Sequence, residues 1–113
     1  MRTLGLVLAI LLLGAGTLRA TASAAEEPTA NLTIKDHRFE PAELILPAGT
    51  KVKIIVKNLD PTPEEFESIE LRREKIVPGG GEVAVYVGPL KPGSYKFFGD
   101  FHQDTAKGVI VVK

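Results

Sequence analysis

The sequence contains no cysteine, no tryptophan, one methionine and only two histidines among its 113 residues. Without cysteine the chain can form no disulfide and offers no thiolate to a metal. Neither sign of charge is in excess, because 14 basic residues balance 14 acidic ones. This balance gives no support to a nucleic acid or an anionic membrane surface as a partner. The sequence also lacks a convincing Ser-His-Asp arrangement, phosphate-binding glycine loop or CxxC motif, so hydrolase, nucleotide-binding and thiol-redox functions have no support.

No apolar run reaches the roughly 20 residues that a membrane-spanning helix needs. The longest run, residues 4–13, follows the basic residue Arg2 and precedes Ala22-Ser23-Ala24, an A-x-A cleavage pattern. This arrangement predicts a secretory signal peptide over residues 1–24, with an uncleaved anchor as the alternative. We therefore expect an exported protein, periplasmic in a bacterial source, with no direct membrane insertion after cleavage. Without Arg2 and Arg19 the mature chain carries 12 basic and 14 acidic residues, a net charge of about −2.

The remaining sequence has the pattern of an all-β protein. After a short polar lead-in at residues 25–30, short stretches of alternating apolar and polar residues are separated by Pro- and Gly-rich turns, and no window predicts an amphipathic helix. Strands are expected from residue 31 onward, at 44–46, 52–56, 65–71, 83–87, 95–98 and 108–112, with residues 72–75 as a charged connection. Short strands at this spacing predict a single β-sandwich domain over residues 31–113.

Three segments together resemble the cupredoxin family, whose fold is a Greek-key β-sandwich. They are Phe39-x-Pro41-x-x-Leu44-x-Leu46-x-x-Gly49 with the strand that follows, Leu90-x-Pro92-Gly93-x-Tyr95-x-Phe97, and His102 followed by Gly108-Val109-Ile110-Val111-Val112. Blue-copper members hold copper through two histidines, a cysteine and a methionine. Here the resemblance places Gly99 at the cysteine position, Ala106 at the methionine position and the acidic run of residues 64–67 at the first histidine. Only His102 remains, so the resemblance implies the fold and argues against a blue copper centre.

A narrower resemblance is to the small periplasmic cupredoxin-like proteins of bacterial ferrous-iron uptake systems. It rests on Phe66-Glu67-Ser68-x-Glu70-Leu71, on Glu74-Lys75-x-Val77-Pro78-Gly79-Gly80, and on the run from Gly88 to His102. Those proteins work beside a high-affinity iron permease, and oxidising iron or handing it over is a role proposed for them. The resemblance implies that this chain acts with a membrane iron permease and other periplasmic components of such a system.

Residue pattern, together with the position that the resemblance gives His102, predicts a metal site. Glu65 and Glu67 lie two apart on the expected strand and point to one face, which Ile69 and Leu71 continue as an apolar surface. Because carboxylates at the rim of a core are costly without a balancing cation, we expect Glu65, Glu67, His102 and Asp100 to be metal ligands. The alternative is a strand offset by one residue, with Phe66 inside and Glu65 and Glu67 in solvent, and Glu64 is then the nearest substitute.

Two further residues have open roles. Asp104 is a ligand, an acceptor that orients the imidazole, or a loop-capping acid. His37 lies near the end of the first strand and either approaches the same site or is solvated.

The donor types favour hard metal chemistry. Carboxylate and imidazole suit iron, manganese, zinc or Cu(II), and carboxylates favour Fe(III) over Fe(II) because they balance the additional charge. Together with the resemblance, which implies a role in ferrous-iron import, the first hypothesis is a protein that holds iron, copper or both in a non-blue site, either as an Fe(II) oxidase or as a carrier. The others are a copper-binding electron-transfer protein and a metal-free interaction module.

Overall fold

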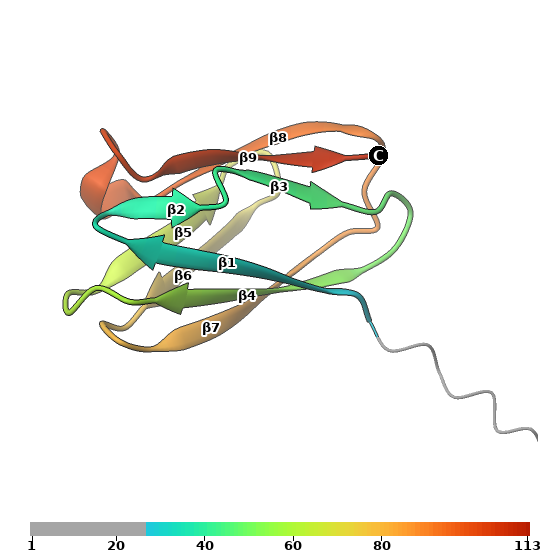
Figure 1. Ribbon diagram of the computed structural model, residues 1–113. Coiled ribbons are helices and arrows are strands. Elements are labelled where there is room, and N and C mark those ends of the chain that lie inside the picture. Colours follow the sequence, from blue (N-terminus) through green and yellow to red (C-terminus); the bar gives the residue numbers. More distant parts are fainter. Residues whose placement is uncertain (1–26) are drawn as a thin grey trace, which may run out of the picture.

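The structure is a computed structural model that describes residues 27–113 (Figure 1). The expected signal peptide at residues 1–24 lies outside the described residues. The described chain forms nine strands and one short 3₁₀ helix: β1 Thr29–Lys35, β2 Arg38–Glu40, β3 Glu43–Leu46, β4 Val52–Asn58, β5 Glu64–Ser68, β6 Arg73–Val77, β7 Glu82–Val87, β8 Gly93–Phe98, η1 Asp100–His102 and β9 Lys107–Val112. Within residues 27–113, no helix is long and apolar enough to cross a membrane.

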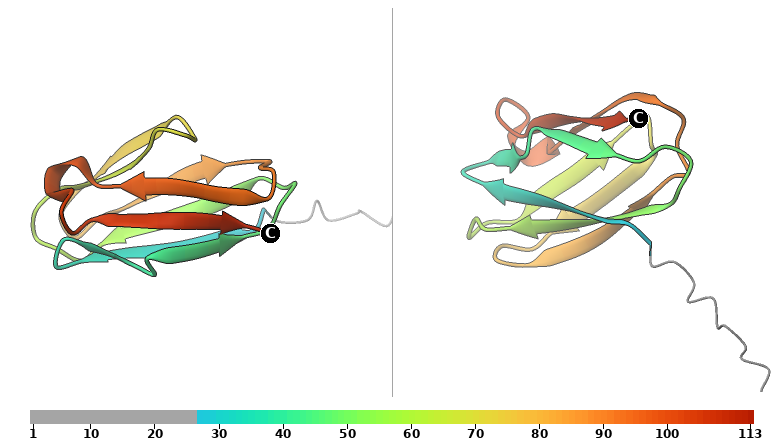
Figure 2. Two further views of the ribbon diagram at one scale, coloured as in Figure 1. Left: turned by 90° about the horizontal axis from the view of Figure 1, so that it is seen from above. Right: turned by 45° about the vertical axis from the view of Figure 1, so that its right-hand side comes forward.

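Two sheets pack face to face, as the sequence predicted. One has the strand order β2-β1-β4-β7 and the other the order β3-β9-β8-β5-β6. The pairs β1–β4 and β3–β9 are parallel, and the other neighbouring strands are antiparallel. Both views in Figure 2 show β8 and β9 side by side, with the C-terminus at the end of the sandwich opposite η1.

The inner faces of the two sheets form one apolar core. Val52, Ile54 and Val56 of β4 point inward, and Leu44 and Leu46 of β3 do the same, which confirms the predicted alternation of these strands. At the end of the sandwich that carries η1, the core is aromatic. Phe39, Phe66 and Phe97 pack edge-on or stacked, with ring centroids 4.9 to 6.2 Å apart.

The structure corrects two strand predictions. The strand predicted at residues 65–71 is β5, which begins at Glu64 and ends at Ser68; Ile69 beyond it is 72% exposed and does not continue a core face. The charged segment predicted as a connection, residues 72–75, instead enters the edge strand β6 at Arg73. Edge strands commonly carry exposed charges that discourage pairing with other chains, so charge alone did not exclude a strand here.

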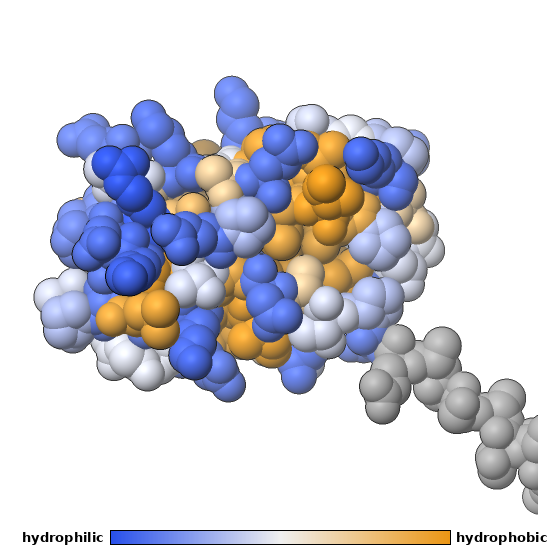
Figure 3. Space-filling model, in the orientation of Figure 1, coloured by the Kyte–Doolittle hydropathy of each residue, from blue (hydrophilic) through white to orange (hydrophobic). Residues whose placement is uncertain are grey.

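Three connections meet at one end of the sandwich. They are the β1–β2 turn at residues 36–37, the β4–β5 loop at 59–63 and the β8–β9 connection at 99–106, which contains η1. Parallel pairing of Ile34 with Asn58 brings the first two together, and pairing of Glu67 with Phe98 adds the third. Figure 3 shows hydrophilic residues gathered at this end and apolar surface over β3. The candidate site lies at this end.

Candidate metal centre

Glu64, the first residue of β5, is the centre of the site. Strand β5 turns Glu64, Phe66 and Ser68 toward the interior, and Glu64 is only 1% exposed although it is a carboxylate. Its position is the outermost inward-facing one of the strand, so its oxygens meet the loops rather than the apolar core. A carboxylate at this depth needs partners that compensate for the loss of water.

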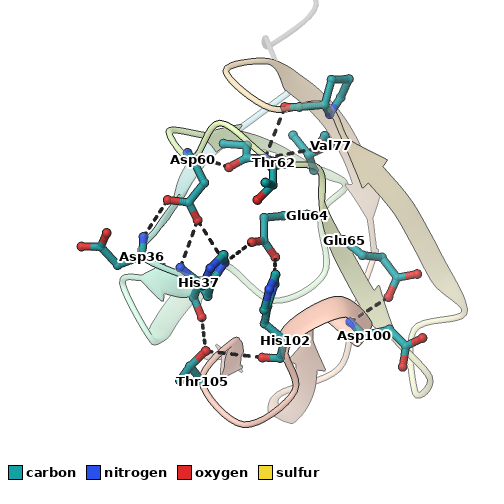
Figure 4. Close-up of polar contacts among 12 residues, drawn as sticks. Asp36, His37, Asp60, Thr62, Glu64, Glu65, Val77, Asp100, His102 and Thr105 are labelled. Atoms are coloured by element: carbon teal, nitrogen blue, oxygen red, sulfur yellow. Dashed lines mark hydrogen bonds and ion pairs between the residues drawn. The ribbon is translucent and has the colours of Figure 1, made fainter.

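The partners are the two histidines of the chain. His37 places its Nδ1 2.5 Å from Glu64 Oε1, and His102 places its Nδ1 3.0 Å from Glu64 Oε2. Figure 4 shows both rings beside Glu64, and they stack with centroids 3.5 Å apart and planes 20° apart. The two imidazoles are part-exposed, at 42% and 35% of their side-chain surface, so the site opens to solvent on their side. One nitrogen of each histidine and one carboxylate oxygen lie within 4.8 Å of one another, which is compact enough to surround one ion.

His37 reaches the site from a tight turn. Asp36 and His37 both have left-handed backbone angles, with φ of 52° and 57°. Their N–H groups donate to the two oxygens of the buried Asp60 carboxylate, at 2.8 and 3.0 Å. The hydrogen bond to Glu64 is the largest influence on the pKa of His37 and raises it, while partial burial opposes that rise.

His102 reaches the site from the end of η1. Its N–H donates to the carbonyl of Gly99 at 3.2 Å, and its own carbonyl accepts from the N–H of Ala106 at 2.8 Å. The start of η1 is fixed by Glu65, whose Oε1 accepts the N–H of Asp100 at 3.0 Å. A surface cavity of about 490 Å³ opens beside both histidines and is otherwise lined by residues 100–101 and 103–105.

Glu65 and Glu67, the carboxylates predicted as ligands, lie on the opposite face of β5 from Glu64. There they form a separate group with Glu74, within 4.8 Å. Glu65 is only 3% exposed, and burial raises its pKa to about 7, assisted by Glu67 and Glu74 and opposed by the Asp100 N–H. The alternative prediction, a strand offset by one residue, is right that Phe66 points into the core. It is wrong that Glu65 is in solvent, because Glu65 is buried.

The structure therefore joins His102 with two residues that the sequence ranked lower, Glu64 and His37. Asp100 is exposed, and its carboxylate accepts a hydrogen bond from the Gln103 amide instead of facing Glu64. Asp104 is exposed on the cavity wall. One signal could have identified Glu64: Phe66 is a large aromatic on a short strand, and the residues two before and two after it share its inward face. No local signal shows that the turn at His37 reaches β5.

Comparison with known proteins identifies the family of the domain that carries this site. A family model described as "Cupredoxin-like domain" matches residues 6–112. The chain belongs to the cupredoxin-like domain family. It is also 53% identical over 81 residues to an uncharacterized protein of Rickettsia prowazekii (strain Madrid E), in a match that covers 72% of this chain and 65% of that protein's length.

Solved structures of other proteins share the fold at low sequence identity. The metal-binding domain of the Cu(I)-exporting P-type ATPase CopA of Streptococcus pneumoniae D39 has a TM-score of 0.67 at 17% identity, over 75% of this chain and 84% of that one. Auracyanin A, a "blue" copper protein from Chloroflexus aurantiacus, has a TM-score of 0.64 at 17% identity, over 75% and 98%. Amicyanin from Paracoccus versutus has a TM-score of 0.60 at 18% identity, over 75% and 81%. These similarities confirm the predicted cupredoxin-like β-sandwich.

Within this cupredoxin-like domain, the positions predicted to have lost sulfur ligands are tightly packed. A Cβ added to Gly99 would lie 2.8 Å from the carbonyl oxygen of Glu65 and 3.1 Å from the Cβ of Ala106. Ala106 is itself 1% exposed and belongs to the core. With no cysteine in the chain, the centre offers nitrogen and oxygen donors and cannot be a blue, thiolate-ligated copper site.

Proposed function

We propose that this cupredoxin-like protein binds a metal ion through His37, Glu64 and His102 and takes part in ferrous-iron import. One observation carries the proposal: a carboxylate that is 1% exposed sits between the Nδ1 atoms of two imidazoles at the open end of the sandwich. An ion at this point would bind the two Nδ1 atoms, with each neutral imidazole then carrying its proton on Nε2, and would balance the charge of an ionised Glu64. Two imidazole nitrogens and one carboxylate form a ligand set that suits a divalent transition metal.

The donor set supports iron or Cu(II) rather than Cu(I). Soft thiolate and thioether ligands select Cu(I), whereas imidazole and carboxylate suit Fe(II), Fe(III), Zn(II) and Cu(II). A negatively charged oxygen donor stabilises Fe(III) more than Fe(II), because the ion of higher charge gains more from it. As an oxidase, the protein would pass one electron from each Fe(II) to an acceptor such as Cu(II) or O₂. As a carrier, it would deliver the bound ion unchanged.

The place in iron import rests on the sequence. The signal-peptide pattern at residues 1–24 indicates export, and the segments around Phe66, Val77 and His102 resemble the cupredoxin-like proteins of ferrous-iron uptake systems. We propose the periplasm as the compartment and a membrane iron permease, with other periplasmic components of that system, as partners. The open cavity beside the histidines would let an ion leave toward such a partner.

A copper protein is the second candidate. Two imidazoles and a carboxylate also suit Cu(II), and the solved relatives include proteins whose names describe them as copper-binding. The absence of cysteine restricts this candidate to a colourless or weakly coloured centre. Copper and iron binding are compatible if copper is the electron acceptor for iron at this or a neighbouring site.

Anaerobic calorimetric titration of the mature protein with Fe(II), Cu(II), Zn(II) and Mn(II) tests the proposal. We expect binding of one Fe(II) or Cu(II) ion, abolished by Glu64→Ala and by His102→Ala and strongly weakened by His37→Ala. Glu67→Gln is the matched control, because it changes a carboxylate of the same strand that faces away from the histidines. Loss of binding in Glu67→Gln with retention in Glu64→Ala would instead support the ligand set expected from the sequence. No heat with any metal would favour an interaction module.

Adding O₂ or Cu(II) to the Fe(II)-loaded protein separates an oxidase from a carrier. Formation of Fe(III) faster than in buffer, and its loss in Glu64→Ala, would support oxidation at this centre. If the bound iron remains Fe(II) with either O₂ or Cu(II), the protein acts as a carrier and not as an oxidase.

A further inference from the structure

The β1–β2 turn, which carries His37, has a backbone conformation that its own residues do not favour. Both central residues of the turn, Asp36 and His37, have left-handed backbone angles, which side chains with a Cβ adopt less readily than glycine. Turns of this kind between strands usually contain Asn-Gly or Asp-Gly, which adopt the conformation readily. The pair Asp-His has no glycine, so contacts from elsewhere in the molecule must stabilise the turn.

Asp60, on the β4–β5 loop, supplies those contacts. Its carboxylate is 6% exposed, and each oxygen accepts one N–H of the turn, from Asp36 at 2.8 Å and from His37 at 3.0 Å. Figure 4 shows Asp60 between the loop and the turn, on the side of His37 opposite Thr105. Hydrogen bonds to an ionised acceptor are roughly twice as strong as neutral ones. One buried carboxylate therefore satisfies both central N–H groups of an unfavourable turn.

Asp60 is itself held rigidly. Its N–H donates to Oδ1 of the fully buried Asn58 at 2.9 Å, and its carbonyl accepts from the N–H of Gly80 at 3.0 Å. The Asn58 amide also donates to the carbonyls of Thr62 and Val77, at 2.8 and 3.2 Å. The carboxylate thus projects from a loop that is fixed to both sheets, which is the requirement for a group that positions another.

The hydrogen bond from His37 to Asp60 is made by the backbone N–H, while the ring makes a longer ion-pair contact with the same carboxylate. Asp60 Oδ2 lies 3.6 Å from His37 Nδ1, beyond hydrogen-bond distance, whereas Glu64 lies at 2.5 Å from the same nitrogen. On the other side, the Thr105 hydroxyl donates to the His37 carbonyl at 2.5 Å. Both polar backbone groups of His37 are therefore bonded to other loops, and the imidazole remains available to the buried carboxylate.

We propose that Asp60 is the positioning residue for His37, fixing the β1–β2 turn so that the imidazole is preorganised as a ligand. This inference rests on the proposed metal-binding function. Groups that orient a metal ligand without touching the metal typically change affinity by about 10–100-fold when they are replaced. Asp60→Asn keeps the size of the side chain but loses the charge, and it presents an amide NH₂ to one of the two backbone donors. We expect a loss of Cu(II) affinity within that range.

The experiment is a double-mutant cycle with Cu(II), measured by chelator competition and electron paramagnetic resonance. Asp60→Asn is made in the wild type and in His37→Ala. We expect wild-type spectra with two coupled nitrogens and Asp60→Asn spectra with one, and no further loss of affinity when Asp60→Asn is added to His37→Ala. An equal loss in both backgrounds, or two coupled nitrogens with unchanged affinity, would overturn the inference. Asp36→Asn is the control: it removes an exposed charge of the same turn, keeps the backbone donor and tolerates the left-handed angle.

Amide hydrogen exchange of the metal-free protein separates this inference from the proposed function. We expect Asp60→Asn to speed exchange of the Asp36 and His37 amides by about tenfold or more, the factor equivalent to losing about 1.4 kcal/mol of local stability. Unchanged exchange would overturn the inference whether or not a metal binds. Absence of Cu(II) and Fe(II) binding to the wild type would refute the metal function, while the exchange result would still decide the role of Asp60 in the turn. If Asp60→Asn does not fold, hydrogen exchange of the wild-type protein tests the inference instead. Amides of residues 36 and 37 that exchange without protection would overturn it.

Discussion

Restoring a side chain at Gly99 tests whether the packing of this domain excludes a thiolate. The backbone of Gly99 has φ of −113°, which any residue can adopt, so glycine is needed for space and not for its dihedral angle. A Cβ there would lie 2.8 Å from the carbonyl oxygen of Glu65, closer than real Cβ atoms come to other heavy atoms. Because that oxygen belongs to the backbone, strand β5 or the start of η1 must shift. Overpacking of this kind costs about 1–3 kcal/mol.

Urea denaturation of Gly99→Ala and Gly99→Cys measures this cost. We expect both variants to be less stable than wild type by about the same amount, because both add the Cβ. For a domain of this size each kcal/mol lowers the melting temperature by roughly 4–8 °C. Gly99→Ala is the matched control, since it adds the atom that collides and no sulfur. If Gly99→Ala is as stable as the wild type, the reasoning is refuted. If Gly99→Cys is also as stable as the wild type and shows an intense thiolate-to-copper absorption band, the domain can accommodate a thiolate ligand at this position.

Two further predictions concern the carboxylate group on the outer face and the aromatic core. Burial raises the pKa of Glu65 from 4.5 to about 7, so the folded state holds this proton more tightly than the unfolded state and stability falls as pH rises between these values. Glu65→Gln, compared with wild type by urea denaturation of metal-free protein, should flatten this profile and stabilise the fold by on the order of 1–3 kcal/mol at pH 8; a wild-type profile that rises over the same interval would contradict this. Phe97→Ala should cost about 3–5 kcal/mol, because Phe97 is 1% exposed between Phe39 and Phe66. The comparison is Phe101→Ala, which removes a ring that is 46% exposed and should change stability by less than about 0.5 kcal/mol, and equal losses in the two variants would contradict the role of the aromatic core.

The two acidic groups of β5 illustrate how far a local pattern can lead. Alternation correctly indicates that carboxylates two residues apart share a face, and it places Glu65 with Glu67. It does not say which face is inward, because a shift of one residue exchanges the two faces of a strand. The loop before β5 contains Pro61 and Pro63, so the inward and outward alternation of side chains in β4 cannot be extended into β5. The inward face is decided by Phe66, whose ring packs against Phe97 of β8.

The sequence by itself determined the all-β class, the alternation of strands such as β3 and β4, the lack of a thiolate and the presence of one histidine, His102, near the end of the chain. These follow from residue types and short-range periodicity, which are local properties. Only the tertiary structure decided that Glu64 faces the histidines, that His37 arrives from the β1–β2 turn, and that Asp60 holds that turn. Each of these depends on contacts between residues 23 to 38 positions apart, which pairing of β1 with β4 and of β5 with β8 brings together.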